Sequence, residues 1–326
     1  MPPEAICGGF FTPVDRALQS KMNIRPAVFW TLLAISVTVV WGYFSSRLIL
    51  NIGRMKDIVT PANLRVPSEN VSFYSGKRKL AGWYVPSDDK NSRSTVIVCH
   101  GWGASKGDVL PSTIFLRARH NLFYFDFTAH GESSGRKVSM GKYESEDILA
   151  AVGYLAAERP ASSKKIGVWG FSMGASAAIT AAAGDGGRIA AVAAESPFYS
   201  YDEITSHYAR RFLKVPDFPF AALARLVVRI RLCHNPENYS PRLSVGKISP
   251  RPFLVIAAAG DENIPVSSTK KLFDAAGEPK SLKIFDSHGH GAAHVEHPEE
   301  YRKLLGDFFG AHLRPSLSAR PKAVIK

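Results

Sequence analysis

The sequence predicts an α/β fold, built on a mostly parallel, doubly wound sheet with a small helical cap and preceded by one N-terminal transmembrane helix. Three observations lead to this prediction. From about residue 95 onward, short apolar runs alternate with helical patterns, as they do where helices connect parallel strands. At 170–174 the motif Gly-Phe-Ser-Met-Gly joins one apolar run to a helix of small residues. Residues 26–46 carry no charge over about the length that crosses a bilayer.

Length and composition allow one large domain behind the apolar segment. The chain has 326 residues, of which 45% are hydrophobic, so it can bury a sizeable core. We predict an N-terminal segment at 1–25, a transmembrane anchor at 26–46, an α/β domain at 60–313 with its cap at about 196–249, and a basic, disordered tail at 314–326.

Charge and cysteine content exclude some classes of partner. The formal net charge of +13 favours solubility and affinity for anionic membrane surfaces. The sequence has no basic stripe with interleaved aromatic residues, so we expect no nucleic-acid partner. The three cysteines, Cys7, Cys99 and Cys233, form no Cys-x-x-Cys pair, so we expect neither a disulfide framework nor a cysteine-based zinc site.

The uncharged segment 26–46 is best explained as a retained single-pass anchor. Trp30, Trp41 and Tyr43 lie toward its ends, where amphipathic rings favour the membrane interface. A buried core helix is one alternative, but a segment apolar on all sides ahead of the α/β domain argues against it. A cleaved signal peptide is the other. Its apolar stretch of about 7–15 residues ends in small residues, whereas this one ends in Trp-Gly-Tyr-Phe. Basic residues flank both ends, so the side of the membrane that the domain faces is not predicted.

Ser172 is the candidate nucleophile. A Gly-x-Ser-x-Gly motif between a strand and a helix is typical of a nucleophile elbow, a strained turn that lifts the serine hydroxyl clear of the sheet. Gly170 and Gly174 relieve the crowding two positions away on either side. The next backbone N–H, that of Met173, begins a helix and can stabilise negative charge there. The alternative is an ordinary turn with a helix-capping serine, but the flanking strand and helix favour the elbow.

A catalytic serine needs a base, and the base needs an acid that orients it. In this architecture both follow the serine along the chain, and the acid comes first. Asp261 stands just after the apolar run at 252–258, where ligand-facing groups of open α/β sheets lie. The next strand-like run leads into a loop that contains His288, His290 and His294, and we expect the base there.

These motifs resemble the serine hydrolases of the α/β-hydrolase fold over roughly residues 70 to 312. Within that fold the resemblance is to the lysophospholipase-like branch, which includes membrane-anchored acylglycerol and lysophospholipid hydrolases. The segment Cys-His-Gly-Trp-Gly at 99–103 is similar to the family's oxyanion loop after the third strand. This resemblance implies that the backbone N–H of Trp102 is a second oxyanion donor beside that of Met173.

Two further loops carry the resemblance. The loop at 125–135 is similar to the family's loop after the fourth strand, but Ala129 stands where the family usually has glycine. The turn is therefore expected to differ in shape. Asp261 with Ile264-Pro265 matches the family's acid motif.

The resemblance also selects among the histidines. His290 aligns with the family's base because it precedes Pro-Glu-Glu-Tyr at 298–301. The implied triad is Ser172, Asp261 and His290, with His288 and His294 as alternative bases.

Other interpretations of these acids and histidines stay open. Glu195 ends a strand-like run after the elbow helix, a position from which some relatives of this fold supply the acid. Four histidines between 288 and 297 raise the possibility of a metal site. Their spacing contains no His-Glu-x-x-His pattern, so we expect no metal, and we expect no cofactor.

The segment 196–249 interrupts the alternation of strands and helices and is both apolar and basic. One interpretation is an ordinary amphipathic helix pair that closes the end of the sheet. The other is a lid that offers an apolar wall to an acyl chain and positive charge to a phosphate or a membrane surface.

The function expected from these residues is hydrolysis of carboxylic esters, with a small-molecule ester or lipid as substrate, by a membrane-anchored serine hydrolase. A peptidase or amidase with the same triad is an alternative, and a pocket carboxylate such as Glu195 or Glu203 would then bind a free amine. A catalytically silent, membrane-tethered scaffold is a second alternative. The sequence does not predict the oligomeric state.

Overall fold

One eight-stranded sheet forms the core of the protein, in the strand order β1-β2-β4-β3-β5-β6-β7-β8. β2 runs antiparallel to both of its neighbours, β1 and β4, and every other neighbouring pair runs parallel. The mostly parallel α/β sheet expected from the sequence is therefore confirmed. The strands are β1 (Glu69–Ser75), β2 (Arg78–Val85), β3 (Ser94–Cys99), β4 (Asn121–Phe125), β5 (Lys165–Phe171), β6 (Ile189–Glu195), β7 (Phe253–Ala258) and β8 (Lys280–Phe285).

The structure, a computed structural model, describes residues 13–313, with side chains from residue 26 onward. The predicted tail at 314–326 and the first twelve residues lie outside the described residues. The helices are α1 (Pro13–Leu50), α2 (Leu110–Thr113), α3 (Lys142–Glu158), α4 (Met173–Gly184), α5 (Tyr201–Arg211), α6 (Ala222–Leu232), α7 (Val266–Asp274), α8 (Ala293–Glu296) and α9 (Pro298–His312).

Apolar side chains cover both faces of the central strands. Every residue of β3 and of β7 is buried. One apolar cluster joins the sheet to α3 and α4, and a second joins its other face to α9. A strand covered on both faces has no solvent side, which explains why these runs are apolar throughout instead of alternating.

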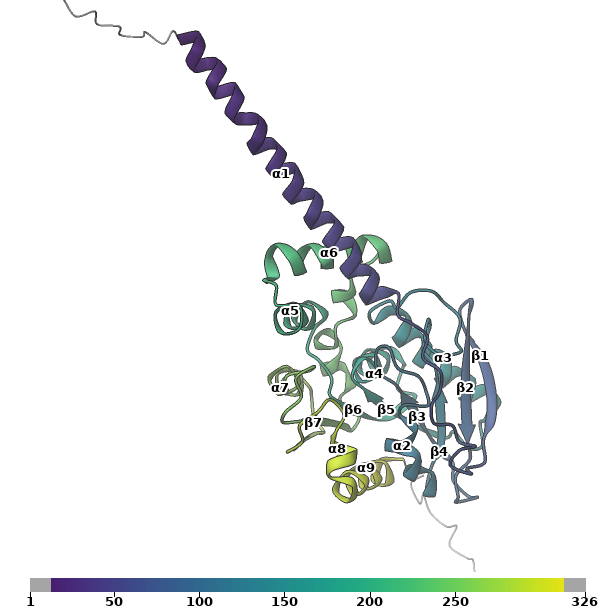
Figure 1. Ribbon diagram of the computed structural model, residues 1–326. Helices are drawn as coiled ribbons and strands as arrows, with labels where there is room; N and C mark the ends of the chain where they lie inside the picture. Colours follow the sequence, from purple (N-terminus) through teal and green to yellow (C-terminus); the bar gives the residue numbers. More distant parts are fainter. Residues whose placement is uncertain (1–12, 314–326) are drawn as a thin grey trace, which may run out of the picture.

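α1 extends well beyond the α/β domain (Figure 1). Within the described residues, 26–50 is the one helical stretch long and apolar enough to cross a membrane, with a mean hydropathy of 1.8 and 6% of its apolar window buried. The helix begins at Pro13, so the boundary predicted at residue 25 falls inside it. Near its other end Ser46 and Leu50 are fully buried, because α1 meets the domain there.

The segment expected to form a cap, between β6 and β7, contains α5 and α6. A short irregular turn, Asp217–Ala221, joins these helices, and three 3₁₀ turns between Pro236 and Ile248 lead back to the sheet. α6 crosses α1 on the side of the domain from which α1 departs (Figure 1). α5 touches the loop after β7 through a hydrogen bond of 2.8 Å between His207 Nε2 and the carbonyl of Glu262.

Candidate active site

Ser172 occupies a sharp turn between the end of β5 and the start of α4. Its φ of 55° and ψ of −114° lie outside the regions that non-glycine residues ordinarily adopt. A Cβ on Gly170 would lie 2.4 Å from the carbonyl oxygen of Gly174, and a Cβ on Gly174 would lie 2.5 Å from the carbonyl oxygens of Cys99 and His100. Glycine is thus required at both flanking positions, by the turn itself and by the loop after β3.

Asp261 and His290 meet beside this turn. Nδ1 of His290 lies 2.7 Å from Oδ2 of Asp261, and the Asp261 side chain is almost completely buried. The other carboxylate oxygen, Oδ1, accepts hydrogen bonds from the backbone N–H groups of Asn263 and Ile264, both at 2.9 Å. Ser196 donates a third bond of 2.9 Å, to Oδ2. The carboxylate is therefore fixed in position and directed at the imidazole.

Burial raises the pKa of Asp261, but hydrogen bonding to His290 and the charge of that ring oppose it. With the bonds from Ile264 and Ser196, they leave the pKa of Asp261 below its usual value. The carboxylate is consequently charged at neutral pH, as an acid that stabilises an imidazolium must be.

Phe171 brings the base loop against the elbow. Its ring lies 4.6 Å from the ring of His290, centroid to centroid. A Cβ on Gly291 would lie 2.8 Å from Phe171 Cζ, so the loop approaches as closely as glycine permits. On the other side, a Cβ on Gly101 would lie 3.6 Å from the Cβ of Ser172. The serine thus has the base loop on one side and the loop after β3 on the other.

The loop after β3 carries the expected oxyanion donor. Within the described part of the chain, the backbone N–H groups of Trp102 and Met173 donate no hydrogen bond. Two buried histidines hold this loop against the loop after β4. His100 Nε2 accepts the N–H of Phe127 at 3.0 Å, and His130 Nε2 accepts the N–H of Gly103 at 3.3 Å.

Both histidines must be neutral to accept these bonds. Burial lowers the pKa of His100, and it lowers that of His130 to about 3. Each ring donates from Nδ1 to a backbone carbonyl, of Gly101 and of Thr128 respectively. Both histidines therefore shape the loop after β3 and keep it against the loop after β4.

Asp126 orders the loop after β4. Its carboxylate accepts the N–H of Lys106 at 2.8 Å and that of Glu132 at 2.9 Å. Ala129 adopts a φ of 69°, a left-handed conformation that glycine adopts most readily. An alanine holds this conformation at a cost of about 1–2 kcal/mol.

A buried lysine beneath this loop was not anticipated from the sequence. The ammonium of Lys106 is fully buried and lies 2.6 Å from Asp57, 2.8 Å from Asp126 and 2.9 Å from Glu132. Burial lowers the pKa of Lys106, but the three carboxylates more than offset this and raise it above its usual value. These carboxylates are close enough together to hold a metal ion. The lysine already supplies the positive charge at that point.

The segment that follows α1 also reaches this loop, and no pattern in the sequence signals it. The indole Nε1 of Trp102 donates to the carbonyl of Ile49 at 3.1 Å, so the oxyanion loop is bonded directly to the end of α1. Arg54 donates to three carbonyls of the loop after β4: those of Gly131, Ser133 and Gly135. With Asp57 on Lys106, residues 49–57 form a connecting strap across both loops.

The alternative acid is placed elsewhere. The Glu195 carboxylate is buried and accepts a 2.6 Å hydrogen bond from the hydroxyl of Tyr301. Burial raises the pKa of Glu195 to about 7. Its backbone carbonyl accepts the N–H of Ser172 at 2.8 Å, so Glu195 supports the elbow through its main chain.

The other loop histidines contact separate partners. His288 is exposed and lies 3.9 Å from Glu296. His294 bonds to the carbonyl of Gly291, and His297 to that of Asp286. Among the three histidines considered as base, His290 is the one beside Asp261.

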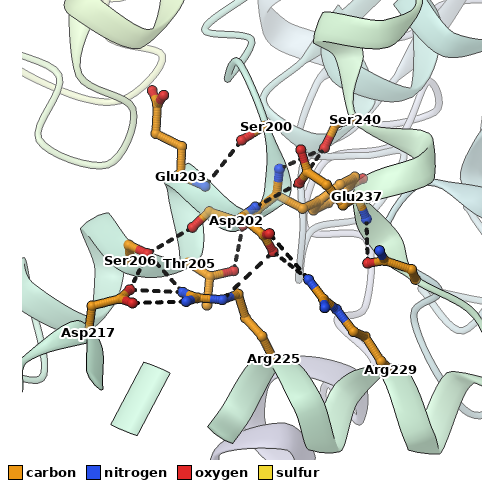
Figure 2. Close-up of polar contacts among 12 residues, drawn as sticks. Ser200, Asp202, Glu203, Thr205, Ser206, Asp217, Arg225, Arg229, Glu237 and Ser240 are labelled. Carbon is orange, nitrogen blue, oxygen red and sulfur yellow. Dashed lines mark hydrogen bonds and ion pairs between the residues drawn. The ribbon is translucent and has the colours of Figure 1, made fainter. Parts of the chain in front are cut away.

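Ion pairs hold the two cap helices together (Figure 2). Arg225 of α6 binds Asp217 with two hydrogen bonds of 2.9 Å and also contacts Ser206 of α5. Arg229 of α6 lies 3.2 Å from Asp202 of α5. Glu203 points away from this cluster in Figure 2 and pairs with Lys271 of α7 at 2.7 Å.

Comparison with known proteins identifies the family. Residues 132–316, more than half of the chain, match the prolyl oligopeptidase family. The chain belongs to that family. Protein YqkD of Bacillus subtilis is 30% identical over 234 residues, which cover 70% of this chain and 74% of YqkD. Protein bem46 of Schizosaccharomyces pombe is 26% identical, covering 70% and 72% respectively.

A solved structure is also similar to this chain. The Pyrococcus furiosus esterase Pf2001 superposes with a TM-score of 0.68 at 26% identity, covering 81% of this chain and all of the esterase chain. The fold is the α/β-hydrolase fold expected from the sequence, and the protein is a serine hydrolase. The matched family and this structure assign no lysophospholipase-like specificity, so the substrate belongs to the proposal that follows.

Proposed function

We propose that the protein is a membrane-anchored carboxylic ester hydrolase with the triad Ser172, His290 and Asp261. His290 takes the proton of the Ser172 hydroxyl as the serine attacks the acyl carbon, and Asp261 stabilises the resulting imidazolium. The backbone N–H groups of Trp102 and Met173 donate to the oxyanion. His290 then protonates the leaving alcohol, and water releases the acyl group by the same steps.

The observation that carries this proposal is the Asp261–His290 pair, 2.7 Å apart, on loops that meet the Ser172 turn. Phe171 touches the His290 ring, and Gly101 lies against Ser172, so base and oxyanion loop flank the same serine. The unbonded N–H groups of Trp102 and Met173 suit a developing negative charge. Removal of one such donor typically costs about 2.7–4 kcal/mol in the barrier.

Ester substrates are supported by the similarity to Pf2001, which is itself an esterase. Lipid-like substrates are supported by the apolar stretch of α1 and by its contact with the cap. A single-pass anchor suits that stretch better than a cleaved signal sequence, because one side of its last turns packs against the domain. Ser46 and Leu50 would leave holes in the domain if α1 were removed.

A peptidase remains the second candidate because the matched family is named for one. An exopeptidase of this kind would need a free carboxylate that binds the substrate amine. Glu195 is buried against Tyr301, and Glu203 is paired with Lys271. These pairings favour the ester over the peptide.

A fluorophosphonate probe, which reacts only with an activated serine, tests the proposal on the full chain in membranes. We expect wild type to be labelled and Ser172→Ala to lose the label. The matched control is Ser176→Ala, one helical turn later, whose buried hydroxyl has no hydrogen-bond partner among the described residues. Labelling retained in Ser172→Ala would contradict the elbow, and no labelling of folded wild type would favour the silent scaffold.

Substrate class is tested on the same membranes with paired esters and amides of increasing acyl length. We expect ester turnover to exceed amide turnover and to rise with acyl length. Faster cleavage of aminoacyl amides would favour the peptidase instead.

A further inference from the structure

The outward face of α6 is apolar and exposed. Leu226 is 51% exposed and Ile230 is 67% exposed, whereas Ala224 and Val228 on the opposite face are buried. Positions 226 and 230 are one helical turn apart and lie on one side of the helix, about 160° from the buried side. Phe218, in the turn before α6, is 81% exposed. An apolar face of this kind on an amphipathic helix needs an apolar partner or a lipid surface.

This face lies beside the apolar part of α1. At the crossing, a Cβ on Gly42 would lie 3.0 Å from Cγ of Leu223 and 3.2 Å from Cγ2 of Val227, so the two helices are in close contact. Trp41 of α1 also packs edge-on against Phe220. α6 lies on the side of the domain from which α1 departs (Figure 1), and its exposed face is opposite the face that it buries.

The point at which α6 crosses α1 lies where we expect the membrane interface to be. The uncharged stretch ends at Ser46 and Arg47 is the first charge after it. Roughly twenty apolar residues span about 30 Å of hydrocarbon. The crossing at Gly42 is four residues before the end of this stretch, or about 6 Å inside it, which matches the depth of about 5–10 Å at which interfacial helices lie.

The charged side chains of the cap also suit a membrane interface. Residues 201–233 contain six basic and three acidic side chains. Arg231 of α6 contacts the Tyr43 ring of α1 and donates to Ser46, at the level where lipid head groups would begin. Arg210 and Lys214, at the end of α5 and just after it, are exposed. Basic side chains near an anionic surface strengthen binding to it.

We propose that α6 lies in the lipid–water interface of the membrane that α1 enters, with Phe218, Leu226 and Ile230 among the acyl chains. The proposal rests on the anchoring role of α1 in the proposed function. The cap is then a second membrane contact, and it places the hydrolase domain against the bilayer surface. A lipid can thus move from the bilayer to the cap without crossing water.

Spin labels on the full chain in vesicles of phosphatidylcholine and phosphatidylglycerol test this placement. Single cysteines are introduced at Leu226 and Ile230 after Cys7 and Cys233 are replaced by serine; Cys99 is buried and stays. Val37 of α1 serves as the bilayer reference, and Lys90, exposed between β2 and β3, as the aqueous reference. Collision with oxygen reports lipid, and collision with a water-soluble nickel chelate reports water.

We expect labels at 226 and 230 to collide more often with oxygen than with the nickel chelate. Their ratio of oxygen to nickel collisions should lie between the ratios of the labels at 37 and 90. Labels at 226 and 230 that match Lys90, while Val37 is in lipid, would overturn the placement of α6 and leave the anchor intact. Low collision rates of these labels with both reagents would mean that a second copy of the protein covers the exposed face of α6. That result would also overturn the proposed placement of α6. An aqueous label at Val37 would overturn the anchor and this inference together. None of these readouts needs catalysis, so they can fail independently of the probe labelling.

Discussion

At the scale of single residues, hydrogen bonds distinguish side chains that the sequence leaves equivalent. Three histidines compete for the role of base within seven positions, and His290 alone among them contacts Asp261. Asp261 in turn is held by two backbone N–H groups and by Ser196. The proposed acid is thereby fixed in place, and it fixes the histidine that it contacts as the proposed base.

Replacement of His290 tests this pairing. We expect His290→Ala to lower kcat for an ester by about 10⁴-fold or more, because no other group takes the serine proton. His288→Ala is the matched control in the same loop, and its exposed ring should leave kcat within about twofold. Steady-state kinetics on the membrane-bound enzyme provides the measurement. A larger loss of kcat in His288→Ala or His294→Ala would assign the role of base to that histidine instead.

The raised pKa of Glu195 predicts that the stability of the protein depends on pH. Its folded pKa is raised to about 7, whereas an unfolded glutamate titrates near about pH 4.3. The folded state therefore binds this proton more tightly, and its stabilising contribution is complete below about pH 4 and lost as the pH rises to about 7. Glu195→Gln keeps the side chain neutral throughout. We expect the stability of this variant relative to wild type to increase by a few kcal/mol between about pH 4 and pH 8.

Thermal unfolding of the detergent-solubilised protein at several pH values measures this difference. Glu299→Gln, at an exposed site on α9, is the control and should track wild type at every pH. A constant offset between Glu195→Gln and wild type would mean that the pKa of Glu195 is the same in the folded and the unfolded protein.

At the scale of elements, the connecting strap 49–57 joins the end of α1 to the loops that we propose to form the oxyanion site. Trp102 bonds to Ile49, and Arg54 bonds to three carbonyls of the loop after β4. Asp57 bonds to both the ammonium of Lys106 and the N–H of Gly107. α1 and the loop after β3 are therefore one connected unit.

Trp102→Phe tests this connection because it keeps an aromatic ring and removes the indole N–H. A lost hydrogen bond of about 0.5–1.5 kcal/mol that positions the oxyanion donor should lower kcat about 3–10-fold and leave KM nearly unchanged. The control is Trp30→Phe in α1, whose side chain is 64% exposed. If KM rose by as large a factor as kcat fell, Trp102 would be assigned to substrate binding rather than to positioning of the oxyanion donor.

At the scale of the whole molecule, α1 and the cap make one interface on the side of the domain that faces the membrane in our proposal. The helices approach closely because Gly42 has no side chain at the crossing with Leu223 and Val227. Ser46 and Leu50 are fully buried at the same junction. The orientation of the domain relative to α1 is thereby fixed by packing.

Gly42→Val tests this packing. The added side chain meets Leu223 and Val227 at about 3 Å, so we expect a destabilisation of about 1–3 kcal/mol and a lower melting temperature in detergent. Gly53→Val is the matched control, since nothing lies within 4 Å of a Cβ at that position. An unchanged melting temperature in Gly42→Val would mean that the two helices are not in contact.

The sequence by itself determined the elements whose signal is local. Apolar runs buried on both faces marked the parallel sheet, the glycines around Ser172 marked the turn, and the uncharged stretch marked α1, because each depends on residues close together in the chain. Contacts between distant segments had no such signal. The tertiary structure alone placed Lys106 among its three carboxylates, bonded Trp102 to Ile49 and turned Glu195 toward Tyr301. These pairings join residues 20 to 106 positions apart, and only the folded path of the chain decides which charged and polar groups meet when water is excluded.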